Sequence, residues 1–300
     1  MQKNPKLSIV VLSFNVKKLL VDCLESLFKV KSVSDKWEVM VIDNNSQDGS
    51  IDAVKNLNKE IKIIQNQKNL GFAKANNIAI QKAKGEYILL LNPDTVVYPN
   101  TIQTVVKYLE YNPKVGAVTC RVELPSGRLD YSCHRGFPTP WNAFTYFSGL
   151  AKAFPKFKLF SGYTASYLDL KKIHEIDALT GAFTLVRKKA GNEVGWLDED
   201  YFWNGEDLDF CYKLKEKGWK IVYIPEVKIT HFKGSASGLW HTGVGNPSKE
   251  TKKLSALSGT QVMRLFYKKH LAQKNPIFIN WIVYVGISLL EKFRLIKNSL

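Results

Sequence analysis

Acidic side chains stand just after two of the apolar runs in the sequence. Asp43 ends the run at residues 37–43, and Asp94 follows the run at 87–91. A carboxylate at a strand end can accept hydrogen bonds from the imide N–H of uracil or thymine, and we expect this role for Asp43. A carboxylate can also ligate Mg2+ or Mn2+ held by the phosphates of a nucleotide, and we expect this role for Asp94. Capping of the following helix is the alternative interpretation of Asp94.

Two further carboxylates, Glu206 and Asp207, open a predicted helix after an aromatic loop. Either could deprotonate a hydroxyl group near a pocket. With Asp209 they place three acids in the first helical turn, which favours the helix dipole without any catalytic role. His231 follows a predicted strand, where a lone histidine is more often structural than a ligand. From the residues alone, both interpretations stay open at these positions.

The scaffold predicted around these residues alternates strands with helices. Residues 7–13 form a continuous apolar run, and apolar residues at helical spacing follow it. The pattern repeats, with strands at 37–43, 61–65, 87–91 and 115–122 and helices from 50, at 72–83 and at 99–111. Buried strands between helices predict an α/β fold with a mostly parallel, Rossmann-like sheet flanked by helices. Because ligands bind at the carboxyl ends of such strands, the acids after them lie where chemistry is expected.

The remainder of the chain is less regular. Residues 124–172 are aromatic and punctuated by proline, which predicts loops and short helices. Regular structure is predicted to resume at 176–186, followed by a helix at 206–217 and strands at 220–224 and 227–230. From about residue 248, two basic helices separated near Asn275 and Pro276 are predicted to form a C-terminal tail.

Composition narrows the class of protein. The chain has 300 residues, of which 45% are hydrophobic and 23% charged, which excludes disorder, collagen and a small disulfide scaffold. The net charge of +16 indicates a polyanionic partner. Half of it falls in residues 251–300, where nine Lys and Arg face one acid, Glu291. Because this charge is not interleaved with a nucleic-acid-binding motif, nucleic acid is not the expected partner. The four cysteines are widely spaced, which favours reduced thiols in the cytosol.

Seven short motifs occur in an order that resembles a known family. They are Ser8–Asn15, Val41–Ser46, Asn69–Ala73, Leu91–Asp94, Thr180–Phe183, Gly195–Glu199 and Glu206–Asp209. Together they resemble the family 2 glycosyltransferases with the GT-A fold, and within that family the bacterial rhamnosyltransferase-like branch. The resemblance covers about residues 6–235.

The resemblance implies roles for individual residues. Asp207 looks like the catalytic base, with Glu206 as the second candidate, and Asp94 and His231 look like ligands of Mg2+ or Mn2+. The residues implied to bind the nucleotide sugar are Ser13, Asn15, Asp43, Asn69, Gly71, Asn76, Asn92 and Gly181. Asn92 stands where the metal-binding motif of the family has its first acid. The site therefore carries one negative charge less, and we expect it to hold metal weakly before the nucleotide diphosphate arrives.

The implied enzyme is an inverting glycosyltransferase of cell-surface polysaccharide synthesis. It would move a sugar from a dTDP- or UDP-sugar to a saccharide or a polyprenyl-linked acceptor, and the Asn-Pro-Asp motif favours rhamnose. Residues 1–235 would form the GT-A domain, with a nucleotide-sugar half at 1–123 and an acceptor half at 124–235. Within the acceptor half, residues 137–167 would determine the acceptor. Residues 236–300 would form a basic amphipathic helical tail.

Three other classes of protein share features with this sequence. A dehydrogenase is excluded because no GxGxxG follows the first strand. A processive polysaccharide synthase carries Q-x-x-R-W before several membrane spans, whereas Gln261–Leu265 lacks the tryptophan and no multi-span region follows. A non-catalytic membrane-binding scaffold stays open, although Asp43, Asp94 and Asp207 argue against it.

The tail contains the longest apolar run, residues 277–290. As a helix it would measure ~21 Å, short of the ~30 Å hydrocarbon core, so it should not span a membrane. Trp281 and Tyr284 suit a membrane interface, and Lys292, Arg294 and Lys297 can meet anionic headgroups. We therefore expect a cytoplasmic enzyme bound peripherally to the inner face of the cell membrane. Packing of this helix on protein is the alternative. The short apolar run at residues 7–14 is expected to be a buried strand rather than a signal peptide.

Overall fold

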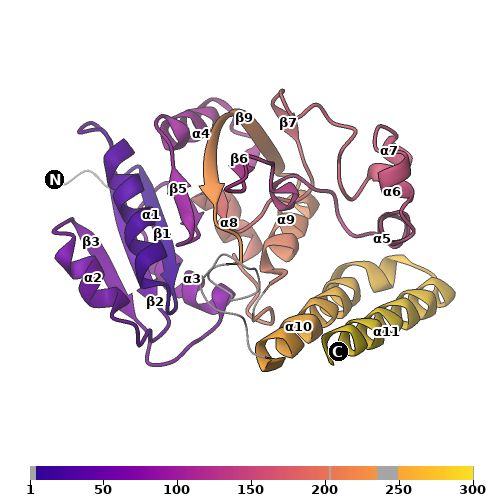
Figure 1. The fold of residues 1–300 in the computed structure, drawn as a ribbon. Coiled ribbons are helices and arrows are strands. Elements are labelled where there is room, and N and C mark those ends of the chain that lie inside the picture. Colours follow the sequence, from indigo (N-terminus) through magenta and orange to yellow (C-terminus); the bar gives the residue numbers. More distant parts are fainter. Residues whose placement is uncertain (1–4, 203, 235–248, 300) are drawn as a thin grey trace.

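The structure, a computed structural model, describes residues 5–202, 204–234 and 249–299. Nine strands of this part form one sheet, ordered β3-β2-β1-β4-β8-β6-β9-β5, with β7 added on β9. Helices flank the sheet, and a helical hairpin lies at the C-terminal end (Figure 1). The strands are β1 (Leu7–Ser13), β2 (Trp37–Asp43), β3 (Ile61–Gln65), β4 (Tyr87–Leu91), β5 (Thr95–Val97), β6 (Val115–Glu123), β7 (His174–Glu175), β8 (Phe183–Arg187) and β9 (Lys220–His231).

The first four strands form the parallel part of the sheet. Helices α1 (Lys17–Val30), α2 (Ser50–Asn56) and α3 (Phe72–Lys82) connect them. The register pairs Ser13 with Asp43 and Val11 with Leu91, so the carboxyl ends of β1, β2 and β4 meet at one edge. All five side chains of β4 are buried, as expected for a strand covered on both faces. This edge is where the polar residues after the strands converge.

The other strands make the sheet mixed. β6 and β9 pair in parallel, but β8 runs antiparallel between β4 and β6, and β5 and β7 run antiparallel on β9. The predicted α/β class with a mostly parallel sheet is confirmed. The short strand β5 was not predicted, and it matters because its register pairs Thr95 with His231. Asp94 therefore lies beside the end of β9.

The predicted break between two strands near residue 225 was wrong. The strands expected at 220–224 and 227–230 are one strand, β9, whose register against β6 shifts after Ile224. Pro225 lies at this shift, where its missing N–H costs no ladder hydrogen bond. In the stretch where regular structure was expected to resume, 176–186, the strand β8 begins only at Phe183, and residues 177–182 are mostly irregular and lead into the site.

Helices occupy most of the remaining chain. Those in the middle are α4 (Thr101–Tyr111), α5 (Pro140–Phe147), α6 (Leu150–Ala153), α7 (Lys158–Ser161), α8 (Lys188–Val194) and α9 (Glu206–Glu216). The predicted basic helices are α10 (Lys249–Phe266) and α11 (Ile277–Ser299), which pack together as a hairpin (Figure 1). A π-helical turn at Tyr267–Leu271 and a 3-10 turn precede the break at Pro276. Within the described residues, no helix combines the length and the apolar composition that a membrane crossing requires.

Candidate active site

A cavity of about 500 Å³ lies at the carboxyl edge of the parallel strands. Its walls come from the ends of β1 and β4, the loop before β8, the start of α9, the end of β9 and one face of α10. Eight of the twelve residues predicted for the site line it: Asn69, Gly71, Asn92, Asp94, Gly181, Glu206, Asp207 and His231. The other four, Ser13, Asn15, Asp43 and Asn76, do not.

Asp43 lies in a closed turn next to this cavity. Its carboxylate is buried and accepts hydrogen bonds from the backbone N–H of Ser46 at 2.8 Å and from the hydroxyl of Ser46. Asn15, from the loop after β1, donates its backbone N–H to the same hydroxyl and accepts from Gln47 N–H at 2.8 Å. The loops after β1 and β2 are therefore bonded to each other, and their role in base recognition stays a prediction.

Asn69 and Gly71 shape the turn that leads into α3. The side-chain oxygen of Asn69 accepts from Gly71 N–H at 2.9 Å and from the amide of Asn44. Gly71 has φ +79°, and a Cβ there would lie 2.8 Å from Phe202, so only glycine fits this position. Asn76 lies within α3 and donates to the carbonyl of Phe72. It is buried and does not line the cavity, so its role in binding the nucleotide sugar stays a prediction.

Asp94 and His231 form one wall of the cavity. His231 Nε2 lies 3.3 Å from Asp94 Oδ1, and His231 Nδ1 donates to Asp130 Oδ2 at 3.2 Å. Lys233 donates to the other oxygen of Asp130 at 2.7 Å. Burial alone lowers the pKa of His231, but the carboxylates of Asp130 and Asp94 outweigh it and raise the pKa to about 9. His231 is therefore an imidazolium at neutral pH, held between two carboxylates.

This wall fits a divalent cation whose coordination a bound phosphate group completes. Asp94 Oδ1 is buried and has no hydrogen bond of good geometry among the described residues. Asp94 and His231 would supply two protein ligands once His231 gives up its proton, and phosphate oxygens would supply others. No group of three or more metal-binding side chains occurs in the described ranges. Asn92 also lines the cavity and could add only a neutral oxygen, so weak metal binding before the nucleotide diphosphate arrives stays a prediction.

Glu206 and Asp207 differ sharply in environment although they are adjacent. Asp207 accepts a hydrogen bond from Arg135 at 2.8 Å and borders the cavity. Glu206 is only 5% exposed, and one of its carboxyl oxygens has no partner among the described residues. Burial, reinforced by the charge of Asp207, raises the pKa of Glu206 well above its ordinary value. Asp207 therefore has a cationic partner, whereas burial disfavours the charged form of Glu206.

Sequence reasoning missed Arg135, Asp130 and Lys233. Arg135 reaches Asp207 because its backbone pairs with that of Ala178, far along the chain. Asp130 lies about a hundred residues before His231, and no motif or periodicity links them. Lys233 follows β9 closely, and its position two residues after His231 was the one available signal.

The C-terminal hairpin also belongs to the site. Gly259, Val262, Met263 and Phe266 of α10 line the cavity. Gly205, which precedes α9, has φ +96°, and a Cβ there would lie 2.4 Å from Val262. Glycine at this position thus lets α10 approach the start of the helix that carries Glu206 and Asp207.

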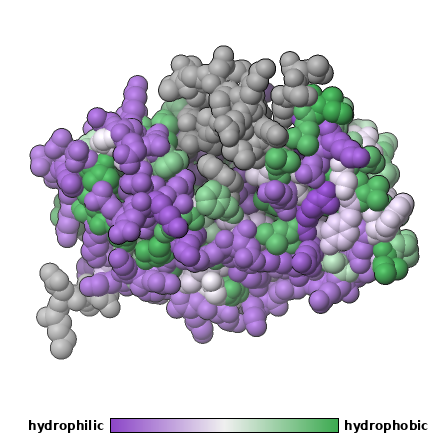
Figure 2. Space-filling model, turned by 90° about the horizontal axis from the view of Figure 1, so that it is seen from below, coloured by the Kyte–Doolittle hydropathy of each residue, from purple (hydrophilic) through white to green (hydrophobic). Residues whose placement is uncertain are grey.

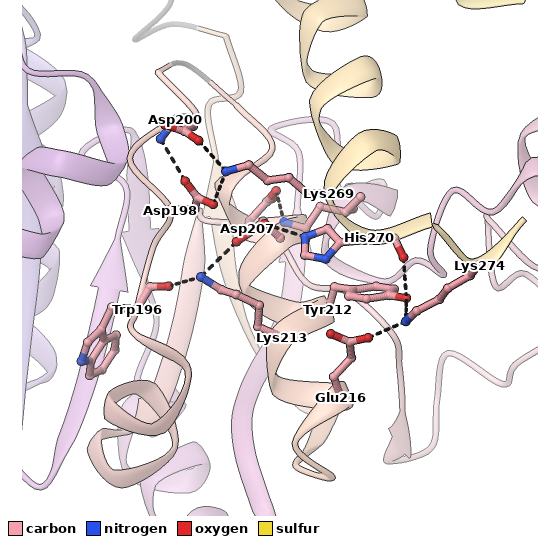
Figure 3. Close-up of polar contacts among 12 residues, drawn as sticks. Trp196, Asp198, Asp200, Asp207, Tyr212, Lys213, Glu216, Lys269, His270 and Lys274 are labelled. Carbon is pink, nitrogen blue, oxygen red and sulfur yellow. Dashed lines mark hydrogen bonds and ion pairs between the residues drawn. The ribbon is translucent and has the colours of Figure 1, made fainter. Parts of the chain in front are cut away.

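Charged contacts hold this hairpin against α9 (Figure 3). His270 Nε2 lies 2.6 Å from the buried carboxylate of Asp209. Lys269 forms ion pairs with both Asp198 and Asp200. Near the other end of α9, Lys274 pairs with Glu216 (Figure 3). These cations of the tail thus have intramolecular partners.

The sequence of this chain is similar to those of known glycosyltransferases. The family described as Glycosyl transferase family 2 matches residues 8–190, more than half of the chain. An N-acetylglucosaminyl-diphospho-decaprenol L-rhamnosyltransferase of Mycobacterium tuberculosis is 26% identical over 67% of this chain and 68% of its own length. A poly-beta-1,6-N-acetyl-D-glucosamine synthase of Staphylococcus aureus is 24% identical over 73% of this chain, which spans 48% of that synthase.

Solved structures share the fold at low sequence identity. A mannosyltransferase from Pyrobaculum calidifontis in complex with GDP-Man and Mn2+ superposes with a TM-score of 0.60 and 18% identity, over 99% of this chain and 74% of the other. TarS of S. aureus in complex with UDP-GlcNAc gives 0.54 and 18% identity, over 84% and 66%. The sequence match and the GT-A-like sheet agree with the resemblance in the motifs. The chain belongs to glycosyl transferase family 2 and is an enzyme that transfers a sugar from a nucleotide sugar.

Proposed function

We propose that this enzyme transfers a sugar, with rhamnose favoured, from a nucleotide diphosphate donor to a hydroxyl group of a lipid-linked saccharide. The observation that carries the proposal is that Asp207 and the Asp94–His231 pair line the same cavity. Asp207 can accept a proton there. The Asp94–His231 pair can, together with a divalent cation, receive the diphosphate of the donor. A single displacement needs both functions within one enclosed space.

Asp207 is proposed as the general base. Its carboxylate would take the proton of the acceptor hydroxyl while that oxygen attacks the anomeric carbon and the bond to the diphosphate breaks. One such displacement inverts the configuration at that carbon. Arg135 would hold the carboxylate in place through its 2.8 Å hydrogen bond. Glu206, whose charged form burial disfavours, is the second candidate for this role.

Asp94 and His231 are proposed to hold Mg2+ or Mn2+ together with the donor. When bound, the cation supplies positive charge that stabilises the departing diphosphate. Support comes from the buried, poorly satisfied oxygen of Asp94 and from the Mn2+ named in the Pyrobaculum structure. Lys233 lines the cavity beside them and adds a fixed positive charge toward the same group.

The proposed acceptor is a polyprenyl-linked saccharide at the inner face of the cell membrane, in polysaccharide synthesis. Support comes from the decaprenol acceptor in the name of the mycobacterial relative and from the Asn-Pro-Asp motif. One face of α11 packs on α10, where Tyr267 donates to Asn280. Its other face leaves apolar side chains exposed, including Phe278, Trp281 and Phe293. This face supports peripheral attachment to the membrane.

The test is a matched pair of variants. Asp207→Asn should cut turnover with a dTDP- or UDP-sugar by ~10² or more, since general-base help is worth that much. Glu206→Gln is the comparison, because it removes the adjacent carboxyl group, and it should lower turnover less than Asp207→Asn does. NMR of the product would show inverted anomeric configuration. Full activity of Asp207→Asn, or retained configuration, would contradict the proposal.

Processive polymerisation is the second candidate function, since the staphylococcal synthase is also a relative. Mass spectrometry separates the two. A single transferred sugar per acceptor supports the proposal, whereas a ladder of products supports a polymerase.

A further inference from the structure

Residues 140–161, which we call the aromatic segment, leave an unusual number of large apolar side chains exposed. The segment consists of the three short helices α5, α6 and α7. Phe157 and Leu159 are each 62% exposed. The other exposed large side chains of the segment are Trp141, Phe144, Tyr146, Phe147 and Phe154. Contiguous exposed apolar surface of this kind marks an interaction site.

The aromatic segment is ordered by its own contacts. Trp141 Nε1 donates to the carbonyl of Leu159 at 2.7 Å, which ties the first helix to the last. The rings of Trp141 and Phe154 both pack against Phe160. At its base, Asn142 donates to the carbonyl of Phe137 at 2.8 Å. The apolar side chains are therefore presented to solvent by a folded unit.

The charge of this region has one sign. From residue 131 to 168 the sequence contains no Asp or Glu. Lys152, Lys156 and Lys158 are exposed between the aromatic side chains, and none of them pairs with a carboxylate in the described ranges. Exposed apolar and aromatic side chains interleaved with lysine are typical of protein surfaces at the boundary of anionic lipid.

We propose that the aromatic segment inserts into the surface of an anionic lipid bilayer. This inference rests on the proposed function, because it supplies the place where a lipid-linked acceptor reaches the enzyme. Phe157 and Leu159 would enter the acyl boundary, and the three lysines would meet lipid phosphates. Charge complementarity selects a membrane over a second copy of this chain, which would bring the same positive charges face to face.

The aromatic segment lies next to the cavity. Pro138 and Tyr163, just outside its two ends, line the cavity, and Phe137 stacks on Phe266 at the end of α10. In Figure 1, α5 lies at the end of the molecule where α10 turns into α11. Hydrophobic and neutral side chains gather toward the same side in Figure 2. A bilayer at this end would contact the aromatic segment together with the exposed face of α11.

A single labelled cysteine tests insertion directly. The four native cysteines are buried, so Leu159→Cys would be the site that an environment-sensitive fluorophore modifies. Vesicles of equimolar phosphatidylglycerol and phosphatidylcholine should shift the emission to the blue. Val33→Cys, on an exposed loop of the N-terminal half, is the control and should not shift. Vesicle binding by the labelled protein without a shift at position 159 would overturn the proposal.

A second pair of variants tests whether the three lysines of the aromatic segment bind the anionic vesicles. Lys152→Gln/Lys156→Gln/Lys158→Gln should weaken binding to the same vesicles by about 100-fold at low salt, since each lysine near an anionic surface contributes about fivefold. The control neutralises three other exposed lysines and should lose far less: Lys29→Gln/Lys82→Gln/Lys107→Gln. Equal losses in the two triple variants would contradict a specific surface.

The outcomes separate this inference from the proposed function. Hydrolysis of the donor in solution should be unchanged in the Lys152/Lys156/Lys158 variant, because none of these residues lines the cavity. If the wild type binds vesicles as described but transfers no sugar, the proposed function fails and the surface stands. If Phe157→Ala/Leu159→Ala instead converts a dimer to a monomer without weakening vesicle binding, the segment is a subunit interface and the inference is wrong.

Discussion

His134 should make the stability of this enzyme fall in mild acid. The residue is fully buried, and its Nε2 lies within hydrogen-bond distance of His174 Nε2. His174 Nδ1 is 2.8 Å from the carbonyl of Lys172, so this nitrogen carries the proton and His174 Nε2 is the acceptor. His134 Nε2 is then the donor, which leaves His134 Nδ1 unprotonated. That nitrogen has no partner among the described residues, so a proton added there would have no acceptor.

The size of this loss of stability follows from the pKa of His134. Burial, and to a lesser degree the neighbouring His174, lowers the pKa of His134 from its ordinary value of 6.5 to about 4. Because the unfolded chain binds the proton first, the stability contribution is present above pH 6.5 and is lost as the pH falls to about 4. The difference of about 2.5 pKa units corresponds to about 3 kcal/mol of unfolding free energy.

Urea unfolding at several pH values between 7 and 4 would measure this loss. His134→Phe keeps a ring against Tyr223 and cannot titrate, so its loss over the same range should be smaller by about 3 kcal/mol. NMR titration of the ring protons should place the pKa of His134 near 4. Identical pH dependence in both proteins, or a pKa near 6.5, would refute the claim that burial lowers the pKa of His134.

Two further variants address the cavity walls. Asp94→Ala should weaken donor binding in the presence of Mn2+ at least about tenfold, and much more than it lowers the melting temperature; calorimetric titration with and without chelator measures this, and unchanged binding would remove Asp94 from the metal site. Phe266→Ala should cost about 3–5 kcal/mol of stability, because this buried ring packs on Phe137 and Tyr212 and lines the cavity. Its control is Phe293→Ala, an exposed position that should change urea unfolding by less than about 0.5 kcal/mol.

The parallel half of the fold was predictable because its signals are local. The first four strands start and end where the apolar runs of the sequence do. A short apolar run bounded by polar residues predicts a buried strand. β5 has only three residues, and its existence depends on pairing with β9, more than a hundred residues away. Short strands that depend on a distant partner leave no pattern in the sequence.

The candidate site likewise contains residues that the sequence predicts and residues that it does not. Asp94, Glu206 and Asp207 stand at element ends within recognisable motifs, and the structure places them on one cavity. The sequence could not distinguish Glu206 from Asp207, because only burial and the distant Arg135 make their environments differ. Asp130 was out of reach, since its relation to His231 exists only in the folded chain.

The positive charge of the tail shows why a count along the sequence overstates what a partner meets. Arg264 pairs with Glu291, and Lys269 and Lys274 pair with acids near and on α9. Apart from Glu291, these acids lie at residues 198–216, outside a window over residues 251–300. Ion pairs within the protein satisfy cations that would otherwise attract lipid phosphates, and exposed pairs of this kind add little stability. The lysines of the aromatic segment have no acid within the whole stretch from 131 to 168. An anionic surface should therefore be recognised as much by this segment as by the tail that carries more charge.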